Sequence, residues 1–241
     1  MTDTAANVPG NEGRRVALFN LNPGEVRHEF FLSCLNLVVT DSQGSRLLAG
    51  VYPRISGGNL GIHRNEAVEF FYRDLPFDWL WFVDSDIQLG VDTLDILMRH
   101  ADPETAPIVS GLYVNVAVDG TIIPMAYRYE IGNGSNFVPL TAQEILDNDT
   151  MVVDGVGAGC LLIHRSVIDK MVAAYGWPAP CFQNDIVAGV INGEDFTFCL
   201  RAKELGIPVL SVHTVDLTHI KPHGISKAHL LATDPKETIN A

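Results

Sequence analysis

The sequence predicts an α/β fold with a mixed central sheet and helices on both faces, formed by a single domain. Apolar, strand-like runs alternate with amphipathic, helix-like runs from residue 16 to about residue 114, which is typical of βα units. After residue 119 the runs are strand-like and meet at an Asp-Gly turn, which favours antiparallel pairing. Hydrophobic residues make up 47% of the 241 residues, enough for one large core, and no shift in composition marks a domain boundary.

The first half contains four predicted strands and three predicted helices in regular alternation. A strand over residues 15–20 leads through the loop LNPG into a helical pattern over residues 25–39. The elements that follow are a strand at 47–52, a glycine-rich loop at 56–61, a helix at 63–72, a strand at 79–83, a helix at 91–100 and a strand at 108–114. Ligands of open α/β sheets gather at the carboxyl ends of such strands.

The second half is expected to be antiparallel or mixed, and it begins with a hairpin over residues 119–139. The elements that follow are an apolar strand at 157–163, a helix at 165–175, a loop at 176–193, a helix at 194–205 and one or two short strands at 209–220. A loop as long as 176–193 is typical of a functional flap. We expect a disordered polar leader at 1–15 and a polar tail at 223–241.

The charge balance is strongly acidic. The chain has 16 Lys and Arg against 29 Asp and Glu, a formal net charge of −13, which argues against an extended basic groove for duplex nucleic acid. The four cysteines are far apart and form no C-x-x-C pair, as expected for reduced, buried thiols. The sequence has neither an apolar signal-peptide core nor an uncharged run of membrane-spanning length, so we expect a cytoplasmic protein.

The run WLWFVDSDIQL, residues 79–89, carries the clearest chemical signal. Five large apolar residues indicate a strand that is buried on both faces, and Asp84 and Asp86 follow at its carboxyl end. Two carboxylates in a shared site repel each other, so a bound cation is one reason to place them together. The alternative is that these residues cap the next helix, because Asp and Ser are common at that position.

Three further segments accompany this motif in a fixed order. They are GIHRN at 61–65, GVGAGCLLIHR at 155–165, and NGEDFTFCLRAKELGIPVL with VDLTHIKP within 192–222. Together with D-x-D, they resemble the GT-A glycosyltransferases, particularly the compact, single-domain relatives of the large family 2 of bacteria and phages. The resemblance covers about residues 16–222, and it implies a GT-A fold with a nucleotide-sugar half at 16–114 and an acceptor half at 115–222.

The resemblance implies a divalent cation, Mn²⁺ or Mg²⁺, that neutralises the leaving diphosphate of a nucleotide-sugar donor. Asp86 would bind the cation directly, Asp84 would contact the cation or the donor sugar and ribose, and His219 would supply a nitrogen ligand. The alternative for His219 is a purely structural histidine.

The acidic pair Glu194 and Asp195 opens the helix predicted at 194–205 and matches the family's catalytic position. By resemblance, Asp195 would act as the general base of an inverting enzyme and take the proton of the acceptor hydroxyl. The alternative is that both acids simply occupy a helix first turn, where acidic residues are favoured. In a retaining enzyme, Asp195 would instead position the donor or the acceptor.

Donor contacts are implied at the ends of other strands. Asn22 and Pro23 lie where the family meets the nucleotide base, and Arg64 could reach the diphosphate or shape the donor pocket. The acidic residue that often reads uracil is not evident, and Asp41 is the one candidate. The small residues Gly157, Ala158 and Gly159 either let the sugar approach the backbone or allow two elements to pack closely.

The implied reaction is sugar transfer to a hydroxyl acceptor, which could be a protein, a glycan, a modified nucleobase or a small molecule. One alternative is a non-catalytic sugar- or nucleotide-binding protein of the same fold. A second is a haloacid-dehalogenase-like phosphatase. That family places its D-x-D on the first strand, with Thr or Val two residues beyond the second Asp, whereas this chain has Gln88 there and several elements before the motif.

Overall fold

A computed structural model describes residues 13–117, 119–130, 137–187, 189–221 and 225–227. The predicted leader at 1–15 and tail at 223–241 lie mostly outside the described residues. Within the part that is described, no helix is both long enough and apolar enough to cross a membrane.

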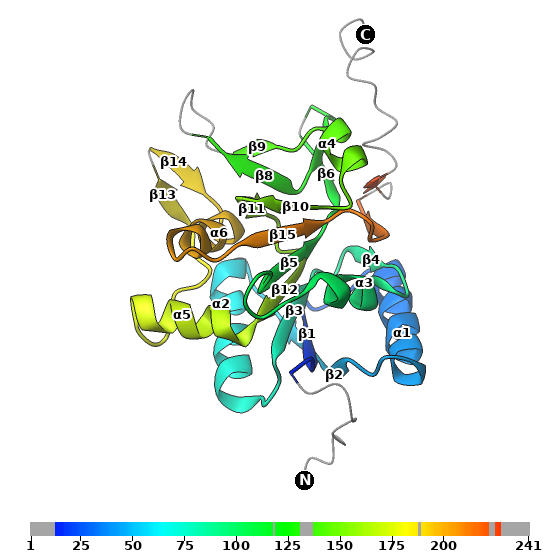
Figure 1. The fold of residues 1–241 in the computed structure, drawn as a ribbon. Helices are drawn as coiled ribbons and strands as arrows, with labels where there is room; N and C mark the ends of the chain where they lie inside the picture. The colour runs from blue at the N-terminus through cyan, green and yellow to red at the C-terminus, as the bar shows by residue number, and fades with distance from the viewer. Residues whose placement is uncertain (1–12, 118, 131–136, 188, 222–224, 228–241) are drawn as a thin grey trace, which may run out of the picture.

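A seven-stranded sheet with the order β10-β15-β5-β12-β3-β1-β2 forms the centre of the molecule (Figure 1). Strands β1, β2 and β3 are parallel, β15 is parallel to β5, and β12 runs antiparallel to both β3 and β5. The predicted mixed sheet is therefore confirmed. The bounds are β1 Val16–Asn22, β2 Leu48–Ile55, β3 Trp79–Val83, β5 Ile108–Gly111, β10 Thr150–Val153, β12 Cys160–His164 and β15 Val209–Val212.

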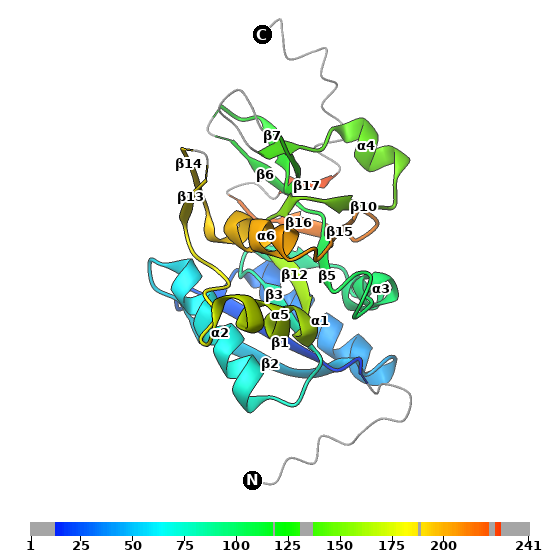
Figure 2. The same ribbon diagram turned by 60° about the vertical axis from the view of Figure 1, so that its left-hand side comes forward.

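Helices cover both faces of this sheet, as predicted (Figure 2). The helices α1 (His28–Gln43) and α3 (Thr93–His100) pack on one face, and α2 (Leu60–Asp74), α5 (Arg165–Tyr175) and α6 (Glu194–Glu204) pack on the other. Alternation along β1 supplies both cores, because Leu18 points to the α1 face and Phe19 to the α2 face. All five residues of β3 are buried, as their apolar pattern predicts.

The second half adds small antiparallel sheets beside the central one (Figure 1). The hairpin predicted over residues 119–139 begins earlier than expected, because β6 (Val114–Val116) pairs with β7 (Ile122–Pro124). After it, β8 (Ala126–Tyr129) lies between β9 (Phe137–Pro139) and β11 (Gly155–Val156). The short helix α4 (Ala142–Asp147), absent from our sequence prediction, begins with a capping box between Thr141 and Glu144.

Two local expectations are corrected. The segment 176–193 is not all loop, because β13 (Asp185–Val187) and β14 (Val190–Asn192) form a hairpin within it. The short strand β4 (Ile87–Leu89), which we did not predict, lies between the D-x-D motif and the helix expected at 91–100, and it pairs with β16 (Leu217–His219). In turn, β16 pairs with β17 (Ile225–Ser226). Strands this short are set by their long-range partners and leave little local pattern.

Arg165, the last residue of the segment GVGAGCLLIHR, fastens α5 to the end of α2. Its guanidinium donates to the carbonyl oxygens of Phe77 at 3.0 Å, Tyr72 at 2.9 Å, Phe71 at 3.2 Å and Leu75 at 2.5 Å. The last carbonyl groups of a helix have no partner within the helix, so one side chain here satisfies several of them. The arginine of this segment therefore has a structural role.

We predict that Arg165→Met lowers the free energy of unfolding by about 2–3 kcal/mol, because several carbonyl groups lose a charged donor at once. Urea unfolding at pH 7 measures the change. The control is Arg73→Met, which removes an exposed ion pair with Glu69 one turn away and should cost less than about 0.5 kcal/mol. Equal effects of the two substitutions would contradict the assigned role.

Candidate functional site

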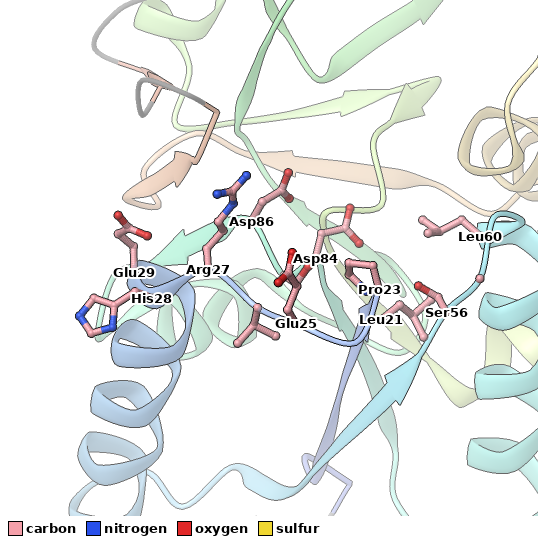
Figure 3. A pocket seen from close by; sticks show the side chains of 13 residues that line it. Leu21, Pro23, Glu25, Arg27, His28, Glu29, Ser56, Leu60, Asp84 and Asp86 are labelled. Carbon is pink, nitrogen blue, oxygen red and sulfur yellow. The ribbon is translucent and has the colours of Figure 1, made fainter.

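A cavity of about 670 Å³ opens at the carboxyl ends of β1, β2 and β3 (Figure 3). The chain leaves β1 toward β2 at the sheet edge and leaves β3 toward the opposite side, so a topological switch point lies between β1 and β3. Open α/β sheets bind ligands at such a point. The lining residues are Leu21, Pro23, Glu25, Val26, Arg27, His28, Glu29, Ser56, Gly57, Leu60, Asp84, Ser85 and Asp86.

The loop after β1 is held by a chain of side-chain amides. Asn20 Nδ2 donates to the carbonyl oxygen of Val83 at 2.8 Å, and Asn22 Nδ2 donates to Asn20 Oδ1 at 3.1 Å. Asn22 Oδ1 accepts from the backbone N–H of Gly24 at 3.0 Å. Of the two residues predicted to meet the nucleotide base, Pro23 lines the cavity, whereas Asn22 is buried beneath it and shapes the loop.

Both carboxylates of the D-x-D motif lie on the cavity wall (Figure 3). The backbone N–H of Asp84 donates to the carbonyl oxygen of Gly159 at 3.0 Å, which ties the end of β3 to the start of β12. The carbonyl oxygen of Asp86 accepts from the N–H of Ile220 at 2.7 Å, which ties the motif to the end of β16. The motif is therefore fixed by the backbone on both sides, and both of its carboxylates line the cavity.

Asp86 contacts the predicted histidine. His219 Nε2 lies 3.2 Å and Lys221 Nζ lies 3.1 Å from Asp86 Oδ2. Burial favours the neutral form of Asp86, but hydrogen bonds from His219 and Lys221 outweigh it and lower the pKa of Asp86 to about 2. The pairing of β16 with β4 sets this contact, because it places His219 directly opposite Ile87.

The ring of His219 is oriented as in a metal ligand. Its Nδ1 lies 2.9 Å from the carbonyl oxygen of Val114, which can only accept, so Nδ1 carries the proton. Nε2 therefore faces a carboxylate oxygen of Asp86, to which it can donate a hydrogen bond when it carries a proton or with which it can share a cation when it does not. The Asp86–His219 pair thus fits a divalent cation.

The predicted three-residue metal site is not assembled, however. Among the described residues, no group of three or more His, Cys, Asp and Glu side chains lies together in a way that could hold a metal ion. Asp84 instead faces Arg64, whose NH2 donates to Asp84 Oδ1 at 3.1 Å. Burial raises the pKa of Asp84 even though the charge of Arg64 opposes the shift.

Arg64 joins the pocket to the acidic start of α6. Its side chain reaches Glu194 Oε1 at 2.5 Å through NH1, while NH2 holds Asp84. The residue is 2% exposed, and its Nε has no hydrogen-bond partner within the described residues. Burial alone would lower the pKa of Arg64, but the carboxylates of Asp84 and Glu194 reverse the shift. The predicted donor-pocket residue therefore lies behind the pocket wall and holds its carboxylates.

Asp195, the predicted base, lies in the first turn of α6 next to Glu194. Its Oδ1 accepts from the backbone N–H of Phe196 at 2.9 Å. Burial raises the pKa of Asp195 to about 6, and the positive charge of Arg64 only partly offsets this effect. A carboxylate with this pKa is ionised at pH 7 and is a stronger base than an exposed aspartate.

The small residues that introduce β12 are explained by packing. A Cβ on Gly159 would lie 2.8 Å from the Tyr113 hydroxyl, and a Cβ on Gly157 would overlap the same group. The Tyr113 hydroxyl accepts from the N–H of Gly159 at 3.2 Å, and Ala158 is buried. The close-packing alternative thus accounts for all three residues, which lie behind Asp84.

Asp41 is corrected as a candidate for reading the nucleotide base. Its two carboxylate oxygens accept from the backbone N–H groups of Leu47 at 2.8 Å and Leu48 at 3.1 Å. It therefore fixes the turn before β2, near the carboxyl end of α1, whereas the cavity lies at the amino end of that helix.

Sequence reasoning missed several residues of the site. Glu25, Arg27, His28 and Ser56 line the cavity, and Figure 3 shows them on the loops that follow β1 and β2 and, for His28, at the start of α1. Their positions directly after two predicted strands were a usable signal, because ligands of open sheets gather at those loops. No comparable local signal marks Tyr113 or Lys221, which reach the site through long-range contacts.

Comparisons with known proteins agree with the fold. No family model matches the chain, and no curated protein matches it. A197 from STIV superposes with a TM-score of 0.57 at 19% identity, over 86% of each chain. A weaker match is a mutant of Drosophila β-1,4-galactosyltransferase 7 in complex with manganese, UDP-Gal and xylobiose; its TM-score is 0.47 at 14% identity, over 86% of this chain and 71% of that one. A second weaker match is a glycosyltransferase involved in the glycosylation of the major capsid of PBCV-1; its TM-score is 0.37 at 12% identity, over 69% of each chain.

The similarity to A197 extends over most of both chains and shows a shared fold. Together with the mixed sheet and its two helical layers, it confirms the α/β fold that the sequence predicts.

We predict that Asp195→Asn stabilises the protein above pH 6. Because the pKa of Asp195 is higher in the folded state than in the unfolded chain, ionisation of this residue opposes folding. Asparagine removes that charge and keeps the oxygen that accepts from Phe196. The gain should be about 2 kcal/mol above pH 7 and should vanish below about pH 4, where the carboxyl is protonated in both states.

Thermal unfolding midpoints of both proteins between pH 4 and pH 8 test this prediction. The control is Asp102→Asn, since backbone N–H groups of Thr105 and Glu104 lower the pKa of Asp102 and its loss should destabilise the fold. A stabilisation by Asp195→Asn that is the same at pH 4 and pH 8 would exclude the buried charge as its cause.

Proposed function

We propose that this protein is a metal-dependent glycosyltransferase that moves a sugar from a nucleotide-diphosphate sugar to a hydroxyl acceptor. One observation carries the proposal. The carboxylate Asp84 on the wall of a switch-point cavity is joined, through the buried guanidinium of Arg64, to the acidic start of α6, where Asp195 lies. Arg64 therefore joins the wall of the proposed donor cavity to the helix turn that carries the candidate base.

The nucleotide diphosphate would occupy the cavity of about 670 Å³, which is within the range of small-molecule sites. The loops at 21–29 and 56–60 would contact the nucleoside, and the D-x-D motif would face the diphosphate. This division agrees with a donor half over residues 16–114.

A divalent cation, Mn²⁺ or Mg²⁺, would be held by Asp86 and His219, while Asp84, paired with Arg64, would face the donor sugar and ribose. Bound there, the cation would act as a Lewis acid that neutralises the charge developing on the leaving diphosphate. The mixed oxygen and imidazole donors of these residues suit Mn²⁺. Lys221, 3.1 Å from Asp86, adds a positive charge on the same side of the site.

Asp195 would serve as the general base. The acceptor hydroxyl oxygen forms a bond to the anomeric carbon, the bond from that carbon to the diphosphate oxygen breaks with its electron pair on the diphosphate, and the hydroxyl proton passes to Asp195. Attack from the face opposite the leaving group inverts the anomeric centre. The pKa of Asp195 near 6 leaves it ionised at pH 7 and able to accept this proton.

Arg64 is assigned as a positioning residue in this scheme. Its guanidinium holds Glu194 and Asp84 at the same time, which fixes the start of α6 relative to the D-x-D motif. The acceptor would enter from the half over residues 115–222, where the β13–β14 hairpin directly precedes Gly193 and the acidic pair. A protein, a glycan, a modified nucleobase or a small molecule could each supply the hydroxyl.

The phosphatase alternative fits the site less well. Its D-x-D would lie on the first strand of the domain with a nucleophilic first Asp, whereas here the motif follows β3 and Asp84 is paired with Arg64. The non-catalytic binding protein predicts nucleotide binding without turnover, and the experiments below separate it from an enzyme.

We expect one of UDP, GDP, CDP, ADP and TDP to raise the thermal unfolding midpoint by about 5–10 °C at saturating concentration when Mn²⁺ is present. The rise should require the cation and disappear in Asp86→Ala, because that variant loses a cation ligand while keeping the cavity. Asp92→Ala, on the neighbouring loop, is the matched control and should respond like the native protein. If no nucleotide moves the midpoint of a well-folded sample, the proposed donor site is wrong.

Asp195→Asn should lower turnover at least about 100-fold while keeping the nucleotide-dependent rise in unfolding midpoint, because the proton acceptor is lost and the donor site is not. Release of nucleoside diphosphate from the donor, in a screen of hydroxyl acceptors, measures the rate. In the native protein this rate should fall below pH 6 as Asp195 becomes protonated. Unchanged turnover in the variant would exclude Asp195 as the base.

A further inference from the structure

The outer face of α1 carries an unusual concentration of exposed apolar side chains. Phe31 is 54% exposed, Leu32 42%, Leu35 48% and Val39 45%. The helix buries its opposite side through Phe30, Ser33, Leu37 and Asp41, so it is apolar on both sides. We call the exposed set Phe31, Leu32, Leu35 and Val39 the outer stripe of α1.

The outer stripe runs along one side of the helix at spacings of three and four residues. Such spacing places Leu32, Leu35 and Val39 one above the other, as in the seam of a paired helix. The four side chains, each about half exposed, offer on the order of 300–400 Å² of apolar surface, the size of a functional patch on a typical monomer. Figure 1 shows α1 at the side of the molecule, with its outer side away from the sheet.

The charges on α1 and on the whole chain limit which partners can cover the outer stripe. Within α1 the acidic residues are Glu29, in the first turn, and Asp41, which is buried, and the helix has no Lys or Arg. An anionic membrane surface would meet no basic residue on this helix, and it would be repelled by a chain of net charge −13. The same net charge makes two copies of the protein repel each other over most of their surfaces.

An uncharged apolar stripe is therefore the part of α1 where two acidic copies can meet at little electrostatic cost. We propose that the outer stripe of α1 is a homodimer interface in which it packs against the same stripe of a second copy. A two-fold axis across the helix between Leu35 and Asn36 would place Leu32 of each copy beside Val39 of the other. The contact is isologous, so it closes as a dimer and does not propagate.

The apolar area of the outer stripe limits how tightly the two copies can bind each other. Stable interfaces bury about 800 Å² on each partner, about twice what the stripe offers. The dimer should therefore be weak, with a dissociation constant on the order of 10–100 µM, and it should form as the protein concentration rises. The first turn of α1 also lines the cavity, so each cavity would open close to the interface.

Sedimentation velocity of the full-length protein between about 2 and 200 µM tests the proposal. The native protein should change from mostly monomer to mostly dimer over this range. Leu35→Glu places two like charges at the centre of the interface and should keep the protein monomeric throughout. Leu146→Glu, a matched substitution at a 60% exposed leucine on α4, should dimerise like the native protein.

A second variant tests the antiparallel arrangement. In a Cys34→Ser background, Asn36→Cys places a thiol next to the axis and should give a disulfide-linked dimer on mild oxidation, whereas Gln143→Cys on α4 should not. Circular dichroism and unfolding midpoints check that every variant is folded.

A native protein that stays monomeric at 200 µM overturns the proposal, as does dimerisation that survives Leu35→Glu in a folded sample. Binding of a monomeric native protein to neutral phosphatidylcholine vesicles, abolished by Leu35→Glu, would assign the stripe to a lipid surface instead and would also overturn it. None of these results depends on whether the cavity binds a nucleotide.

Discussion

The buried charge of Arg64 is the constraint on which the rest of the site depends. A guanidinium removed from water is strongly unfavourable unless carboxylates compensate it, so Asp84 and Glu194 must stay where they are for the fold to hold. Those two acids belong to the loop after β3 and to the start of α6, 110 residues apart in the chain (194 − 84 = 110). The same pairing fixes the relative position of three elements and holds Asp84 on the wall of the cavity.

The pairing of β4 with β16 and the close packing of β12 against β3 position the rest of the site. The three-residue strand β4 follows the D-x-D motif directly and pairs with β16, which brings His219 to Asp86. On the far side of the motif, the close contact of Gly157 and Gly159 with Tyr113 lets β12 approach the end of β3. Backbone contacts thus set the position of the two carboxylates, and the basic side chains around them compensate their negative charge.

Much of the fold was predictable, because its long elements have local signals. The helix expected at 165–175 is α5 with the same bounds, and the apolar run before Asp84 is β3. Strands β4, β13 and β14 were missed, since elements of three residues depend on distant partners. At the site, residue types indicated Asp84, Asp86, Asp195 and His219, but the pairing of Arg64 with two acids depends on contacts across the chain that no local pattern encodes.

The order of these pieces along the chain affects synthesis on the ribosome. A nascent chain that has emerged as far as residue 192 contains every residue that lines the cavity, yet it has neither Glu194 nor His219. At that stage Arg64 has one of its two carboxylate partners, β4 has no pairing strand, and β5 exposes the edge that β15 will cover. The acidic centre therefore gains its final form only after the residues beyond 192 have been synthesised.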